Sequence, residues 1–84
     1  MQFTLLSRSY CHLCDDMRNA LLPVIAGRGI ELVVIDVDAH ADLEKKYGDL
    51  VPVLFHGDVA TGRELCHFHI DPIAVQNALR AEAG

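Results

Sequence analysis

A strand, a helix and a second strand follow one another at the start of this chain, and this succession constrains the fold most. Residues 3–7 form a short apolar run, and residues 31–36 are rich in β-branched side chains, with a near-continuous apolarity that indicates a strand covered on both faces. Between them, apolar residues recur at helical spacing: Leu13, Met17, Ala20, Leu21, Val24 and Ile25. A βαβ crossover of this kind is right-handed, so the two strands should be parallel, with the helix N-terminus at their C-terminal edge.

The helix between these strands has recognisable ends. Asp15 and Asp16 stand in its first turn, where the helix dipole favours negative charge, and Gly27 supplies a C-terminal stop. Pro23 lacks the backbone N–H that a helix interior needs. We therefore expect a kink or a restart near Leu22 rather than a straight helix.

The second half of the chain predicts a short helix, a hairpin and a last helix. Residues 42–47 form a short polar helix closed by the glycine that follows. Residues 53–56 and 63–68 are strand-like and are joined by a glycine-containing turn, which predicts an antiparallel hairpin. The last helix begins with Asp71 as its N-cap and Pro72 at its first position.

Size and composition narrow the class of protein. The chain has 84 residues, of which 51% are hydrophobic, and we expect one folded domain over residues 1–84. Its net charge of −5 would repel a phosphate backbone, which argues against nucleic acid as a partner. The apolar stretches are short and residues 1–4 lack the features of a signal peptide, so we expect a cytoplasmic monomer without membrane contact.

Cys11 and Cys14 are separated by two residues and stand where the first strand ends and the helix begins. Two thiols at this spacing can interconvert between dithiol and disulfide. At the helix start, the Cys11 sulfur can meet unpaired backbone N–H groups and the positive end of the dipole, and both favour the thiolate. Cys14 lies one turn deeper. We therefore expect Cys11, with a pKa below that of Cys14, to attack a substrate disulfide and Cys14 to resolve the mixed disulfide.

The residues beside the two thiols leave their roles open. His12 as an imidazolium would lower the pKa of Cys11 further, whereas a solvent-facing His12 would have no such effect. The carboxylates of Asp15 and Asp16 disfavour a nearby thiolate. Their expected role is stabilisation of the helix.

Cys66, His67 and His69 form a second cluster of chemically active side chains. Alternation along a strand places Cys66 on one face and the two histidines on the other, so a buried cysteine with exposed histidines is the default expectation. The alternative is a zinc site in which Cys11, Cys14 and one or more of these side chains are ligands. The second half of the chain lacks a matching pair of cysteines or histidines for such a site.

The order of the predicted elements resembles the thioredoxin fold and, within it, the small glutaredoxins. The resemblance rests on the motif Cys11-His12-Leu13-Cys14, on the Val51-Pro52 step before the third strand, and on Arg8, where glutaredoxins often carry a lysine. The chain is most similar to a glutaredoxin-like group of bacterial proteins. This resemblance implies an α/β fold, a three-layer α/β/α sandwich with the order β-α-β-α-β-β-α and a four-stranded mixed sheet.

The resemblance also implies how a substrate is held. A cis Val51-Pro52 bond would leave the Val51 backbone to pair with an extended substrate chain, although Pro52 also suits the start of an edge strand. Arg8 either steers a glutathione carboxylate or assists the thiolate, or it is a solvated loop cation. Glutaredoxins hold glutathione with a Gly-Gly pair and an acidic residue. The glycines are absent here, and Asp71 matches the acidic residue. The expected substrate contacts are Arg8, Tyr10, His12, Val51, Pro52 and Asp71.

Together these features predict a thiol–disulfide oxidoreductase of cell redox homeostasis, with Cys11 as nucleophile and Cys14 as resolving thiol. The expected partner is a disulfide-containing protein or a low-molecular-weight thiol. The reaction needs no dissociable cofactor, and glutathione is a candidate reductant. The alternative is a non-catalytic thioredoxin-fold protein that binds zinc or a protein partner through the same cysteines.

Overall fold

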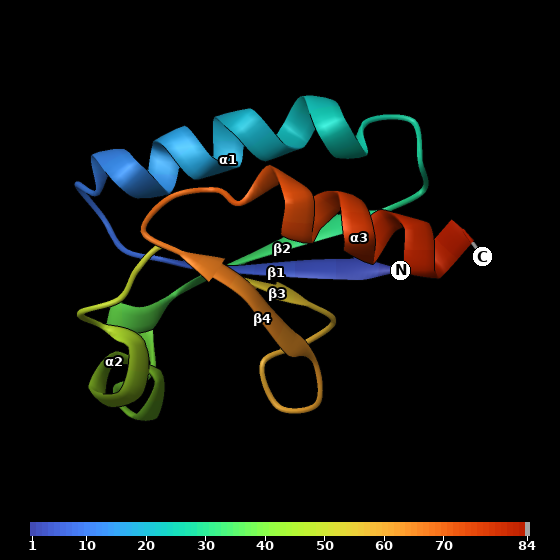
Figure 1. Cartoon of the computed structure of the whole chain (residues 1–84). Coiled ribbons are helices and arrows are strands. Elements are labelled where there is room, and N and C mark those ends of the chain that lie inside the picture. Colours follow the sequence, from blue (N-terminus) through green and yellow to red (C-terminus); the bar gives the residue numbers. More distant parts are fainter. Residues whose placement is uncertain (84) are drawn as a thin grey trace.

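A four-stranded sheet with helices on both faces forms the framework of the molecule, as Figure 1 shows for the computed structural model. The structure describes residues 1–83. Along the chain the elements are β1 (Gln2–Ser7), α1 (His12–Ile25), β2 (Glu31–Asp36), the 3₁₀ turn η1 (Val37–Ala39), α2 (Ala41–Tyr47), β3 (Val53–His56), β4 (Arg63–His67) and α3 (Pro72–Ala83). Helices α1 and α3 cover one face of the sheet, and α2 lies on the other (Figure 1). The predicted α/β/α layers and element order are confirmed.

The sheet has the strand order β2-β1-β3-β4, so β1 and β3 are its central strands. Strand β1 pairs with β2 in parallel along its whole length, from Gln2 opposite Glu31 to Ser7 opposite Asp36. It pairs with β3 in the antiparallel direction, and β3 and β4 form an antiparallel hairpin. The parallel βαβ unit and the hairpin predicted from the sequence are therefore both confirmed.

Strand β2 differs from its prediction. Its near-continuous apolar run predicted a strand covered on both faces, but β2 lies at the edge of the sheet and pairs with β1 alone. None of its side chains is fully buried, and Val34 is 49% exposed. The fully covered strand of the pair is β1, whose residues 3–6 are all buried. Apolar side chains at an edge are half-covered by the helices, so the run alone does not set the position of a strand in its sheet.

Two hydrophobic cores lie on the two faces of the sheet, and β1 contributes to both because its successive side chains point to opposite faces. Phe3 and Leu5 pack beneath α1 and α3, whereas Leu6 packs on the side of α2. The larger core consists of Phe3, Leu5, Met17, Leu21, Ile25, Leu54, Val75, Ala78 and Leu79. The hydroxyl of the buried Thr4 donates to the Gly57 carbonyl at 2.7 Å, so this polar group keeps a partner.

Helix α1 runs without interruption to Ile25, so the restart expected near Leu22 is wrong. Pro23 lies in the last turn of the helix and is exposed, where the loss of one backbone hydrogen bond does not end the helix. After the helix, Gly27 adopts a φ of +74° in a turn closed by a hydrogen bond from the Arg28 N–H to the Ile25 carbonyl. Gly27 therefore acts at the C-terminal stop, as predicted. Within residues 1–83, no helix has the length and apolar content to cross a membrane.

Helix α3 begins as the sequence predicts, with Asp71 before it and Pro72 as its first residue. One carboxylate oxygen of Asp71 accepts hydrogen bonds from the backbone N–H groups of Ile73 and Ala74, both at 3.1 Å. These N–H groups have no partner inside the helix, so the carboxylate satisfies two of the open donors at its start.

We predict that Asp71→Ala lowers the free energy of unfolding by about 1 kcal/mol, because both open donors lose their partner. Urea unfolding followed by circular dichroism measures the change as a lower midpoint at an unchanged m-value. Asp49→Ala, in the loop after α2, is the matched control because Asp49 is also an exposed aspartate. Equal midpoints for the two variants would contradict the capping role.

Candidate active site

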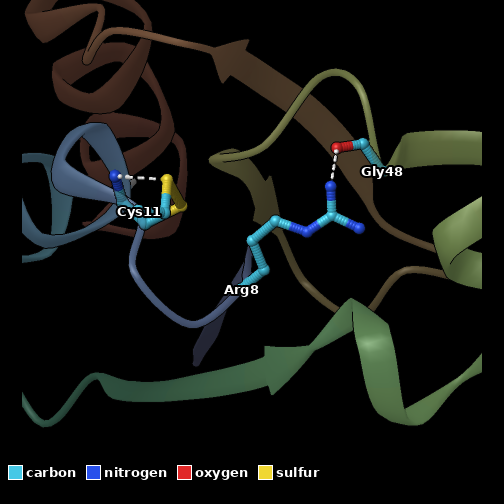
Figure 2. The surroundings of a disulfide bond; sticks show 4 residues. Arg8, Cys11 and Gly48 are labelled. Atoms are coloured by element: carbon cyan, nitrogen blue, oxygen red, sulfur yellow. Dashed lines mark hydrogen bonds between the residues drawn. A yellow bond between two sulfur atoms is a disulfide. The ribbon is translucent and has the colours of Figure 1, made fainter.

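Cys11 and Cys14 are joined in a disulfide at the N-terminus of α1, with their Cα atoms 5.2 Å apart (Figure 2). Cys11 is the N-cap of the helix and is partly exposed. Cys14 lies one turn further along and is only 1% exposed. A partner molecule can therefore reach the Cys11 sulfur more readily than the Cys14 sulfur.

The first turn of α1 directs one backbone N–H group at the Cys11 sulfur and another at the Cys11 carbonyl. The Cys14 N–H donates to Cys11 Sγ at 3.1 Å, and the Asp15 N–H donates to the Cys11 carbonyl at 3.2 Å. Open N–H groups and the helix dipole at this end both favour a thiolate over a thiol when the disulfide is reduced. Cys11 thus lies at the helix start, as the sequence predicts, and a pKa below that of Cys14 stays a prediction.

Tyr10 and His12 flank Cys11 and both are exposed. Tyr10 has a φ of +60°, in the left-handed region that non-glycine residues rarely adopt, and its side chain is fully exposed. The exposed position of His12 is compatible with both of the roles considered for it. Contact of either side chain with a substrate stays a prediction.

The Val51-Pro52 peptide bond is cis, as the resemblance implied. Pro52 is buried, and its carbonyl accepts a hydrogen bond from the Phe68 N–H at 2.9 Å. Because Leu6 pairs with Val53, this step lies beside the point where β1 leaves the sheet toward Cys11. The interpretation of Pro52 as the start of an edge strand is wrong, since β3 is a central strand.

The end of β4 lies at the same end of the sheet as the Val51-Pro52 step. His67 pairs with Val53, and the chain then turns at Phe68, whose φ is +64°, so β4 ends one residue earlier than predicted. Three connections therefore meet at this end of the sheet: the loop from β1 to α1, the Val51-Pro52 step before β3, and the connection from β4 to α3.

Arg8 binds within the protein rather than at the disulfide. Its guanidinium donates to Asp38 Oδ1 at 2.7 Å, to Glu44 Oε1 at 3.3 Å and to the Gly48 carbonyl at 3.1 Å. Figure 2 shows the side chain directed toward Gly48 and away from Cys11. The hydrogen bond to Asp38 raises the pKa of Arg8 above its ordinary value.

Two of the roles considered for Arg8 are therefore corrected. It is not a solvated loop cation, because it connects the end of β1 to η1 and α2, and its guanidinium is not aimed at the thiol it was expected to assist. Its contact with a substrate carboxylate stays a prediction.

Cys66, His67 and His69 do not converge. Cys66 is a free, half-buried thiol, and burial raises its pKa. His67 Nδ1 lies 3.1 Å from Glu64 Oε2, and its ring packs edge-on against Phe68, while His69 is exposed. Among residues 1–83, no three histidine, cysteine or acidic side chains are grouped so that they could hold a metal ion. The zinc site considered from the sequence is not assembled in this structure.

Sequence reasoning missed a groove of about 210 Å³ between α1 and the connection from β4 to α3. Leu13, Met17 and Ala20 of α1 form one wall, and Phe68 and Ile70 form the other, with Asp16 and His69 completing the lining. We call it the α1 groove. Its walls lie about fifty residues apart in the sequence, so no local pattern predicts it. The only signal was Phe68, an aromatic residue in the stretch where glutaredoxins carry glycines.

The comparison with protein families agrees with the fold. Residues 2–80 match the family model described as "Glutaredoxin-like domain (DUF836)". The chain belongs to this glutaredoxin-like family. A search of curated proteins found no match.

Solved structures place this glutaredoxin-like chain among thioredoxin folds. Protein Ne2328 from Nitrosomonas europaea is 34% identical, with a TM-score of 0.76 over 90% of this chain and 87% of that one. The structural genomics target XcR50 from X. campestris is 37% identical, with a TM-score of 0.69 over 94% and 96%. Oxidised mitochondrial thioredoxin 3 from Saccharomyces cerevisiae is 19% identical, with a TM-score of 0.68 over 95% and 76%, and shares the fold.

We predict that Arg8→Gln lowers the urea midpoint of unfolding, because Asp38 and Glu44 lose their shared cation. The difference should shrink at high salt, which screens these partly exposed ion pairs. Arg18→Gln is the matched control, since Arg18 is exposed on α1. A midpoint equal to that of the control at low salt would refute a structural role for Arg8.

We predict that Cys66 makes the protein less stable at alkaline pH. Burial raises the pKa of Cys66 in the folded state, so the unfolded chain loses this proton at a lower pH. Its contribution is complete below the unfolded pKa and is lost as pH rises through the folded pKa.

Urea unfolding from neutral to alkaline pH tests this in a Cys11→Ser/Cys14→Ser background, where Cys66 is the remaining thiol. Adding Cys66→Ala should remove that part of the decline. Identical pH profiles with and without Cys66 would contradict the prediction.

Proposed function

We propose that this glutaredoxin-like protein is a thiol–disulfide oxidoreductase in which Cys11 is the nucleophile and Cys14 the resolving thiol. The main support for the proposal is the asymmetry of the disulfide. Cys11 is partly exposed and caps α1, whereas Cys14 is buried one turn further along the helix. The asymmetry gives each cysteine its own step. The Cys14 N–H that donates to Cys11 Sγ would stabilise the attacking thiolate in the reduced protein.

The reaction begins when the Cys11 thiolate attacks one sulfur of a substrate disulfide. The substrate S–S bond breaks, a mixed disulfide forms, and the first substrate thiolate leaves and takes up a proton. Cys14 then loses its proton and attacks Cys11 Sγ, which releases the second substrate thiol and closes the Cys11–Cys14 disulfide. The protein dithiol loses two electrons and two protons, and the substrate disulfide gains them. An external thiol regenerates the dithiol by the reverse exchange.

The surroundings of the disulfide support an extended protein segment as the substrate. Val51 lies at the end of the sheet where the β1–α1 loop, the start of β3 and the β4–α3 connection meet. No hydrogen bond joins the Val51 backbone to another residue within residues 1–83. Its N–H and C=O can therefore pair with a substrate backbone, as in strand addition. The side chains expected to hold glutathione already have partners, since Arg8 binds Asp38 and Glu44 and Asp71 caps α3.

The proposal predicts different products from two cysteine variants in a Cys66→Ala background. Reduced Cys14→Ser should release one thiopyridone from dithiodipyridine and remain as a Cys11 mixed disulfide. The protein with both cysteines should release two and form the internal disulfide, because Cys14 displaces the second. Cys11→Ser should react far more slowly, since Cys14 is buried. Absorbance measures the released thiopyridone, and mass spectrometry under non-reducing conditions identifies the products.

The same samples separate exchange from the alternative of a non-catalytic zinc or partner protein. Two stable pyridyl adducts, in place of the internal disulfide, would show that Cys14 does not resolve. Stoichiometric zinc in the reduced protein, without thiol-dependent turnover of a model disulfide, would favour the alternative and overturn the proposal.

A further inference from the structure

The α1 groove begins inside the redox motif. Leu13 lies between the two cysteines and lines the groove, which continues along α1 past Met17 to Ala20. Seven residues of helix span about 10 Å, and an extended chain covers that distance in about three residues. A polypeptide whose cysteine is joined to Cys11 can therefore place a side chain two or three residues away in the groove.

The wall of the groove is mostly apolar and open to a partner. Leu13 and Phe68 are 37% and 39% exposed, although both are large apolar side chains. Phe68 holds a left-handed backbone conformation that costs a non-glycine residue energy, and its side chain lines the groove from the β4–α3 side. Exposed apolar side chains gathered around a concave surface are typical of a binding site.

The charge at the groove is negative. Asp16 is the acidic member of its lining, and no lysine or arginine lines it within the described residues. Arg18 lies about 150° around α1 from the centre of the groove-lining residues, and Arg8 is held by Asp38 and Glu44. The whole chain carries a net charge of −5. A segment that enters the groove therefore meets the carboxylate of Asp16 beside His69, with no lysine or arginine in the lining, which favours a cationic partner over an anionic one such as glutathione.

We infer that the α1 groove selects the protein substrate: it binds an apolar side chain two or three residues from the reactive cysteine of the partner, next to a lysine or arginine that pairs with Asp16. The inference rests on the proposed function, since the partner is held while its cysteine is joined to Cys11. The apolar side chain covers Leu13, Ala20 and Phe68. The neighbouring cation meets Asp16 at the rim.

Activated peptides measure this selectivity directly. Each short peptide carries one cysteine as a mixed disulfide with thiopyridine. The pair Leu-Lys, Leu-Glu, Gly-Lys or Gly-Glu stands three residues from this cysteine, after it in one series of peptides and before it in another. Reduced Cys14→Ser/Cys66→Ala protein reacts with each, and the release of thiopyridone gives the rate constant. We expect Leu to accelerate capture about tenfold over Gly, and Lys about threefold over Glu.

Charge-swap variants test the role of Asp16. Asp16→Lys should reverse the preference, so that the Leu-Glu peptide reacts faster than the Leu-Lys peptide. Asp15→Lys makes the same change of charge in the same helical turn, but on the side of α1 away from the groove. It should alter all rates together and keep the Lys preference. The ratio between peptides, rather than the absolute rate, therefore reports binding in the groove and not the pKa of Cys11.

Filling the groove tests the apolar contact. Ala20→Phe should remove the advantage of Leu over Gly, whereas Asn19→Phe, at the next exposed position of α1 and outside the lining, should keep it. Amide chemical shifts in a titration with an unreactive Leu-Lys peptide, with serine for cysteine, give a separate readout. Shifts should concentrate at Leu13, Ala20 and Ile70.

Each contrary result has a distinct meaning. Equal rates for all four peptides, with normal dithiodipyridine exchange, would overturn the groove while leaving the proposed function intact. No reaction with any disulfide would overturn both. Faster capture of the glutathione–thiopyridine disulfide than of the Leu-Lys peptide would assign the site to glutathione. In the absence of peptide, chemical shifts at Leu13 and Ala20 that change with protein concentration would assign the groove to a second copy of the chain. Either this result or the faster capture of glutathione would refute the inference.

Discussion

The pairing of β1 on both sides is the constraint on which the candidate site depends. β1 is hydrogen-bonded to β2 and β3, and its buried side chains contribute to both cores. Its C-terminal end is therefore fixed, with Leu6 opposite both Ile35 and Val53. Only a short loop separates this end from Cys11. The Cys11 sulfur therefore lies at the start of α1, and the buried Cys14 sulfur lies one helical turn further along. The asymmetry of the two thiols thus follows from how β1 is anchored.

The features predictable from the sequence were those encoded by neighbouring residues. Helical spacing after a strand-like run predicted the parallel βαβ unit, and Asp71 before Pro72 predicted the start of α3. The place of β2 in the sheet was not predictable in this way. Its apolar run specified a strand, but the choice between centre and edge depends on where β3 pairs, and β3 pairs with the opposite side of β1.

Contacts between distant segments explain what sequence reasoning missed at the site. The position of Arg8 near Cys11 in the sequence suggested a role at the thiol. Its partners Asp38 and Glu44 lie thirty or more residues away in the sequence, and they hold its side chain away from Cys11. The two walls of the α1 groove are separated in the same way. The cis Val51-Pro52 bond was predictable only from the family resemblance, because no nearby residue requires it.

Phe68 connects the departure from glutaredoxins with the shape of the surface. Glutaredoxins use glycines in this stretch to let glutathione approach the backbone, and here the chain still makes a left-handed turn, at an aromatic residue. The turn keeps the Phe68 N–H on the Pro52 carbonyl while the side chain occupies the space beside α1. The backbone arrangement around the dithiol can therefore be retained while the surface next to it changes from a backbone cradle to an apolar wall. In the proposed reaction, this separates the chemistry at Cys11 and Cys14 from the choice of partner, which depends on the connection between β4 and α3.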